Sequence, residues 1–168
     1  VGSLSIALLS SLGYSVTGSS GKSNIESFLK KIGASEILNR SEVDDKTGRN
    51  LLKETWAGVI DSVGGNTLVT ALNSTKKNGV VLSIGLASSS KIDATVFPFI
   101  LRGVILQGVA ASENSMKERE IIWNKLADWK PKSLECLVED CKLEELSSKI
   151  DQIIDGKLRG RVIVDMRS

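Results

Sequence analysis

The polar turn Ser19-Ser20-Gly21-Lys22 has residue types that could hold a phosphate, and it directly follows an expected strand. In proteins that bind a dinucleotide, a carboxylate at this place usually accepts a hydrogen bond from the ribose 2′-hydroxyl of NAD. No acidic residue occurs between residues 14 and 25. A hydroxyl, a glycine amide and an ammonium suit a 2′-phosphate instead. The turn therefore favours NADP over NAD, with a merely solvated turn as the alternative interpretation.

Two further positions could contact the same ligand. Arg40 follows the next expected strand, and its planar, permanently charged guanidinium could stack on adenine or reach the phosphate. The ordinary alternative is a surface arginine. Gly2 lies at the start of the first expected helix, whose N-terminal amides and positive dipole end would favour a pyrophosphate. The pair Val1-Gly2 by itself is a weak signal, because such pairs occur by chance.

Glycines follow two of the expected strands, at residues 61–65 (Asp-Ser-Val-Gly-Gly) and 84–87 (Ile-Gly-Leu-Ala). In a doubly wound sheet, ligands bind at the carboxyl ends of the strands. Glycine there lets the backbone approach a flat ligand closely, which makes Val63 and Gly85 candidate contacts. Ordinary strand-to-helix turns are the alternative. Asp61 is interpreted as a structural hydrogen-bonding group rather than a base, since no acid or base partner is visible nearby.

The composition excludes several classes of chemistry. The chain has 168 residues, 41% of them hydrophobic and 25% charged, as in a soluble globular domain. It has no histidine and two cysteines, so a Ser-His-Asp triad, a Cys-His pair and a His-ligated zinc site are excluded within it. The net charge of +2 and the absence of a basic run argue against nucleic-acid and membrane partners. No signal peptide is recognised, so the cytoplasm is the expected compartment.

Strand and helix patterns alternate, which predicts an α/β fold with a doubly wound (Rossmann-type) parallel sheet. Strands are expected at residues 14–18, 36–38, 57–63, 80–84, 104–109, 134–138 and 161–165. Helices are expected at residues 4–12, 25–32, 50–53, 68–72, 97–103, 115–129 and 143–154. Capping boxes at Ser23-x-x-Glu26 and Ser115-x-x-Glu118 and an N-cap at Asn66 mark three of the helix starts. The strand from Val104 to Val109 would lie at the sheet edge, where pairing across a two-fold axis would make a homodimer.

These strings resemble the medium-chain dehydrogenase/reductase superfamily, in particular its zinc-free acrylyl-CoA reductase branch, often labelled quinone oxidoreductase. The resemblance covers essentially the whole chain and rests on residues 20–22, 56–65, 96–108 and 160–164. It implies NADP(H) as cofactor and an NADP-binding domain at residues 1–130. Residues 131–168 would return to a catalytic domain built mostly from upstream residues. The family's first strand would precede Val1, so we expect the isolated chain to be poorly stable and inactive.

The resemblance also places individual residues near the cofactor. The Ser20 to Lys22 turn matches the 2′-phosphate end, although many members have arginine at the Lys22 position. Leu86 and Ile100 match positions near the nicotinamide, and Ala111 stands where relatives have serine. The candidate cofactor-binding residues are Gly2, Ser20, Gly21, Lys22, Arg40, Val63, Gly85, Leu86, Ile100, Ala111 and Arg161.

The implied activity is hydride transfer from NADPH to the β-carbon of an activated alkene, such as an enoyl thioester, or to a quinone-like acceptor. The substrate is a small molecule, and no catalytic residue is identified in the chain. A non-catalytic nucleotide-binding module, acting as a redox sensor or structural protein, is an alternative on the same fold. A third possibility is an α/β domain that binds no nucleotide.

Overall fold

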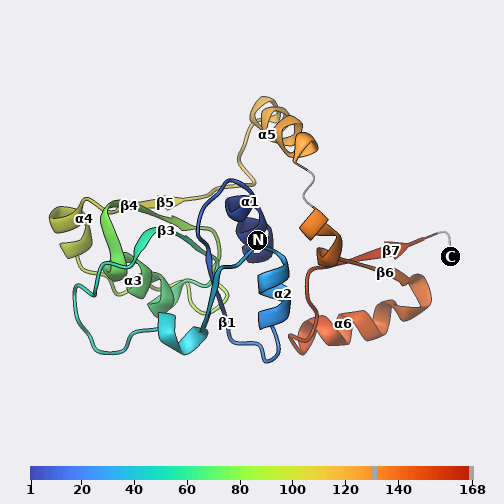
Figure 1. The fold of residues 1–168 in the computed structure, drawn as a ribbon, viewed down its shortest axis with the longest axis horizontal. Coiled ribbons are helices and arrows are strands. Elements are labelled where there is room, and N and C mark those ends of the chain that lie inside the picture. Colours follow the sequence, from blue (N-terminus) through green and yellow to red (C-terminus); the bar gives the residue numbers. More distant parts are fainter. Residues whose placement is uncertain (130–131, 167–168) are drawn as a thin grey trace. The chain divides into compact units, whose positions relative to one another are not determined.

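The computed structural model describes residues 1–129 and 132–166 (Figure 1). The chain divides into two compact units: the first comprises Val1, residues 3–37 and residues 126–168, and the second comprises Gly2 and residues 38–125. The predicted domain boundary between residues 130 and 131 lies outside the described residues and stays a prediction. None of the helices in the described part of the chain is long and apolar enough to span a bilayer.

The N-terminal part of the first unit alternates helix and strand. Its elements are α1 (Gly2–Ser11), β1 (Thr17–Ser20), α2 (Glu26–Lys31) and β2 (Glu36–Asn39), whose last residues belong to the second unit. β1 and β2 form a two-stranded sheet. Apolar side chains of α1, of α2 and the residues beside it, and of the segment before β1 form one core together with Leu137. The core consists of Ile6, Ala7, Val16, Ile25, Leu29, Ile32, Ala34 and Leu137. Gly33 follows α2 with a φ of 109°, where a Cβ would overlap the Ser10 side chain.

The C-terminal part of the first unit contains a parallel strand pair. Its elements are η2 (Lys132–Leu137), β6 (Val138–Lys142), η3 (Leu143–Glu145), α6 (Leu146–Ile154) and β7 (Arg161–Asp165). β6 pairs with β7 in parallel, with Val138 opposite Arg161. The strand expected at residues 134–138 is wrong in its position, because this segment is mostly a 3-10 turn that brings Leu137 into the core of the unit. Trp129 Nε1 donates to Ser11 Oγ at 2.8 Å, which ties this part to α1.

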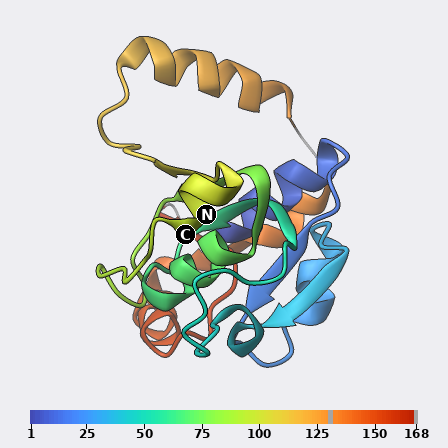
Figure 2. The same ribbon diagram turned by 90° about the vertical axis from the view of Figure 1, so that its left-hand side faces the viewer.

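The second unit contains a three-stranded parallel sheet in the order β3-β4-β5 (Figure 2). Its elements are η1 (Arg40–Val43), β3 (Trp56–Asp61), α3 (Gly65–Ser74), β4 (Thr75–Ser83), α4 (Phe97–Arg102) and β5 (Ile105–Gly108). The core of this unit consists of Leu68, Ala71, Leu72, Val81 and Val104. The α/β class expected from the alternation is confirmed.

Three local predictions are wrong, each because a tertiary or backbone demand overrides the pattern. Residues 50–53 form no helix; instead, Leu52 N–H donates to the Asn73 carbonyl at 2.9 Å. α2 begins at Glu26 without a side-chain cap, since Asn24 in the preceding turn has a φ of 56°. The N-cap of α3 is Gly64 rather than Asn66.

β5 has one strand neighbour, β4, among the described residues, so it lies at the edge of its sheet. Ile105 is 56% exposed and Val109 is 40% exposed, whereas Val104 is buried in the core. An exposed edge with apolar side chains is a surface that proteins normally cover. The homodimer through the Val104 to Val109 strand stays a prediction that this exposure supports.

The N-terminus of α5 (Met116–Asp128) carries the expected capping box. Ser115 donates to Glu118 Oε2 from its amide and its hydroxyl, both at 2.8 Å, and Glu118 N–H donates to Ser115 Oγ at 3.3 Å. Both bonds favour the charged carboxylate and therefore lower the pKa of Glu118. The bond from the Ser115 hydroxyl has the larger effect, and the bond from the Ser115 amide has the smaller one. The prediction of this helix start is confirmed.

We expect the substitution Ser115→Ala to raise the pKa of Glu118 toward the ordinary glutamate value, because it removes the hydroxyl bond that lowers this pKa most. Because the folded pKa is lowered, the contribution of the box to stability is present above the unfolded pKa. It is lost as the pH falls through the folded pKa. An NMR titration of the Glu118 carboxyl carbon in the full-length protein measures the shift, with Ser112→Ala as control. An equal pKa in both variants would contradict the assignment.

Candidate functional site

The Ser20 to Lys22 turn lies in the first unit at the end of β1. Lys22 N–H donates to Ser20 Oγ at 3.2 Å, so the turn is closed by a local hydrogen bond. The Ser20 hydroxyl hydrogen and the Gly21 amide remain able to donate outward. Ser20 is the last residue of β1, and the chain leaves the strand at Gly21 and bends at Lys22. The structure therefore presents the donors that the sequence indicated.

The Lys22 ammonium is the charged group of this turn. Its Nζ donates to the carbonyl oxygen of Leu158 at 2.7 Å. An ammonium has three N–H donors, so this bond leaves two for a ligand. Within residues 1–129 and 132–166, no carboxylate forms an ion pair with Lys22, and its side chain lies at the surface. A positive charge without a carboxylate, beside a hydroxyl and an amide, suits a phosphate.

The Leu158 loop also connects Lys22 to the next candidate. Arg161 lies at the start of β7, opposite Val138, and its side chain is exposed. A groove of about 420 Å³ lies in the same unit. It is lined by Phe28, Cys136, Val138, Glu139, Gln152, Lys157, Leu158 and Arg159. The structure thus places Lys22 in contact with Leu158, three positions before Arg161, and a cofactor contact of Arg161 itself stays a prediction.

Most of the remaining candidate residues lie outside the first unit. Ser20, Gly21, Lys22 and Arg161 belong to the first unit, whereas Gly2, Arg40, Val63, Gly85, Leu86, Ile100 and Ala111 are grouped with the second. Gly2 is the first residue of α1, and a Cβ added to it would have no neighbour within 4 Å. Leu86 and Ile100 are both 68% exposed. Their roles in cofactor binding stay predictions.

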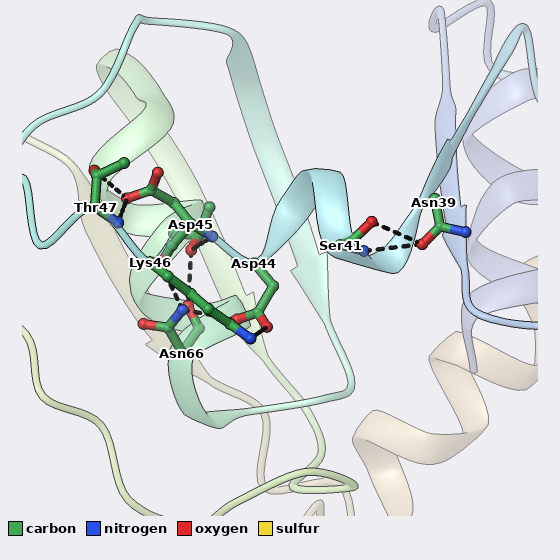
Figure 3. A network of polar contacts seen from close by, with 8 residues as sticks. Asn39, Ser41, Asp44, Asp45, Lys46, Thr47 and Asn66 are labelled. Atoms are coloured by element: carbon green, nitrogen blue, oxygen red, sulfur yellow. Dashed lines mark hydrogen bonds and ion pairs between the residues drawn. The ribbon is translucent and has the colours of Figure 1, made fainter.

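Arg40 and Val63 line one groove of the second unit, with a volume of about 510 Å³. Its wall includes the loop that follows η1 and the first turns of α3 (Figure 3). Asn73 Oδ1 and Thr95 Oγ1 belong to lining residues, are buried, and have no hydrogen-bond partner among the described residues. The groove brings together Arg40 and Val63, which sequence reasoning singled out separately.

A polar network that sequence reasoning missed holds this wall in place (Figure 3). Asn66 Nδ2 donates to Asp44 Oδ1 at 2.7 Å and to the Asp45 carbonyl at 2.6 Å. Asp45 N–H donates to Thr70 Oγ1 at 2.9 Å, and Thr47 donates to Asp45 Oδ2. Asn66 was expected to cap α3, and instead it binds the loop from inside the first turn of the helix. The only sequence signal was the polar character of residues 39–48.

The strand-end glycines are required by contact between two loops of the chain. Gly64 has a φ of 72° and forms an isolated bridge with Ser89. A Cβ on Gly85 would lie 2.6 Å from the Ser62 carbonyl oxygen. Asp61 is 4% exposed and accepts the Gly64 N–H at 2.8 Å, which confirms its structural role. Close packing therefore explains these glycines without a ligand, and a contact of Gly85 with the cofactor stays a prediction.

A zinc site does not fit the residues present. The sequence has no histidine, and its two cysteines are Cys136 and Cys141. In the described part of the chain, no three residues among Cys, Asp and Glu are grouped to hold a metal ion.

Comparison with known proteins gives a family and close relatives. The zinc-binding dehydrogenase family matches residues 1–127. The chain is 35% identical over 169 residues to acrylyl-CoA reductase AcuI of Ruegeria pomeroyi, covering 100% of this chain and 51% of that protein. It thus spans about half the length of the curated relatives that it matches.

Solved structures show the same fold with nucleotides bound. The structure of Escherichia coli K-12 YhdH with bound NADPH has a TM-score of 0.89 at 37% identity, covering 98% of this chain and 50% of that chain. The structure of Bacillus subtilis YhfP with NAD bound has a TM-score of 0.92 at 36% identity, covering 99% and 51%. Both NADPH and NAD thus occur among similar proteins.

Proposed function

Because this chain belongs to the zinc-binding dehydrogenase family, we propose that it is the NADP(H)-binding part of a reductase. The reductase would transfer a hydride to an activated C=C bond, as in an acrylyl thioester, or to a quinone-like acceptor. The relative named acrylyl-CoA reductase supports the first acceptor class. The catalytic domain would come from the rest of the protein, since this chain spans about half of its relatives.

The observation that carries the cofactor preference is the Ser20 to Lys22 turn. Similar proteins have been crystallised with NADPH and with NAD, so the family alone leaves the preference open. In this chain the turn offers a hydroxyl, an amide and an ammonium, and it has no carboxylate to accept from a ribose 2′-hydroxyl. Its donors fit a phosphate on that ribose.

The protein's part in the reaction is to bind and orient. The nicotinamide supplies the hydride when the cofactor is bound. Ser20, Gly21 and Lys22 of the first unit would hold the 2′-phosphate. These contacts fix the cofactor at its adenosine end.

The non-catalytic module remains the second candidate, and one experiment separates it from the reductase. We expect the full-length protein to oxidise NADPH in the presence of acrylyl-CoA, of a quinone, or of both, and to bind NADPH with a change in its fluorescence. Tight NADPH binding without turnover of either acceptor would favour the module. No fluorescence change by a folded protein would contradict nucleotide binding altogether.

A further inference from the structure

A single long-range hydrogen bond links the proposed 2′-phosphate turn to the C-terminal segment. Lys22 Nζ donates to the Leu158 carbonyl at 2.7 Å, although the two residues are 136 positions apart in the chain. Both residues belong to the first unit. At its backbone end, Lys22 is held by the bond from its amide to Ser20 Oγ. The side chain is therefore held at both ends.

Such a restraint matters for a lysine more than for most residues. A lysine side chain loses a large rotamer entropy when a ligand orders it. A carbonyl that already orders the ammonium removes part of this cost before the ligand arrives. The carbonyl is also neutral, so it does not cancel the positive charge that a phosphate would meet.

The loop that carries Leu158 is itself firmly placed. Lys157 N–H and Leu158 N–H donate to the Gln152 carbonyl, at 2.9 and 3.3 Å, which ties the loop to α6. On the other side, Gly160 has a φ of 72°, and a Cβ there would overlap the Leu137 carbonyl. The position of the Leu158 carbonyl thus depends on the fit of Gly160 against Leu137.

We propose that residues 157–160 form a positioning element for nucleotide selection: the Leu158 carbonyl orients the Lys22 ammonium toward a 2′-phosphate. This inference rests on the proposed function, because it concerns the same cofactor. It adds that the C-terminal segment, and not the turn alone, sets the preference for NADPH over NADH. The loop acts through Lys22 and touches no reacting atom.

A double-mutant cycle in the full-length protein tests this element. Gly160→Ala displaces the loop, Gly156→Ala is the matched control, and Lys22→Met removes the ammonium. Gly156 has a φ of 67° and open space around its Cβ, so its substitution strains the backbone without a clash. The measurement is the ratio of the dissociation constants for NADH and NADPH. Loss of fold alone lowers both affinities and leaves this ratio unchanged.

We expect Gly160→Ala to lower the NADPH preference about tenfold, the value of one charge-assisted hydrogen bond. Gly156→Ala should leave the preference for NADPH within about twofold of wild type, since the added Cβ contacts no other group and the backbone strain affects both nucleotides alike. In the Lys22→Met background, Gly160→Ala should change the preference no further. A preference that survives Gly160→Ala, or that falls equally in the Lys22→Met background, overturns the role of the loop.

A measurement on the wild type covers the case in which Gly160→Ala does not fold. A 2′-phosphate that binds Lys22 should also stabilise its partner loop, so NADPH should slow hydrogen exchange of the amides at residues 157–160 more than NADH does at equal saturation. Equal protection by both nucleotides overturns the inference. A wild type that binds NADH as tightly as NADPH overturns the cofactor assignment as well, which distinguishes the two failures.

Discussion

Replacing Lys22 by methionine is expected to weaken NADPH binding about 10- to 100-fold and to leave NADH binding unchanged. A hydrogen bond to a charged group contributes about 1.5–3 kcal/mol, and each 1.4 kcal/mol corresponds to a factor of ten in affinity. Methionine keeps most of the length of the side chain but has no donor and no charge. NADH has no 2′-phosphate and therefore loses nothing when the ammonium is removed.

Isothermal titration of the full-length protein with NADPH, NADH and 2′,5′-ADP measures this effect. Lys30→Met is the matched control, because Lys30 is an exposed lysine of the same unit in the last turn of α2. Lys22→Arg keeps the charge and should retain the preference for NADPH. An NADPH affinity that is unchanged in Lys22→Met, or an equal loss for NADH, would exclude the turn as the 2′-phosphate site.

The second large effect concerns stability. Arg102, the last residue of α4, is 14% exposed at its side chain and donates to the Asn73 carbonyl at 2.8 Å and to the Leu52 carbonyl at 2.7 Å. Its Nε also lies 3.6 Å from Glu54 Oε1. We expect Arg102→Met to lower the free energy of unfolding by about 3 kcal/mol, because it removes a charged donor from both carbonyls. Among the described residues, the Asn73 carbonyl then keeps only its bond from the Leu52 N–H.

Chemical denaturation of the full-length protein measures this loss. Glu54→Gln removes the ion pair with Arg102 and keeps one side-chain oxygen that can accept the Lys77 N–H, as Glu54 Oε2 does at 3.0 Å. Because Glu54 is 46% exposed, this change should cost less than about 1 kcal/mol. Arg102→Lys should recover only part of the stability, since an ammonium cannot reach two carbonyls as the fork of a guanidinium does. Equal losses in Arg102→Met and Glu54→Gln would mean that the ion pair, and not the carbonyl bonds, ties α4 to its neighbours.

Predictions of local structure succeeded where both partners of an interaction lie within one turn. The Ser115 and Glu118 box formed as expected, because residues three positions apart at a helix start lie within reach of each other. The box at Ser23 did not form, since Asn24 takes a left-handed conformation. Asn66 does not cap α3 as expected, because its side-chain amide donates to Asp44 Oδ1 and to the Asp45 carbonyl instead. Such competing partners come from elsewhere in the chain and leave no periodic signal.

The same division holds for the candidate site. The sequence by itself determined the α/β class, through alternating patterns, and the donor set of the Ser20 to Lys22 turn, through local residue types without a carboxylate. Only the tertiary structure decided that the Lys22 ammonium meets the Leu158 carbonyl, and that Arg40 and Val63 share one groove. The physical reason is that backbone carbonyls are the same in every residue. Which carbonyl an ammonium reaches is therefore set by packing and not by residue type.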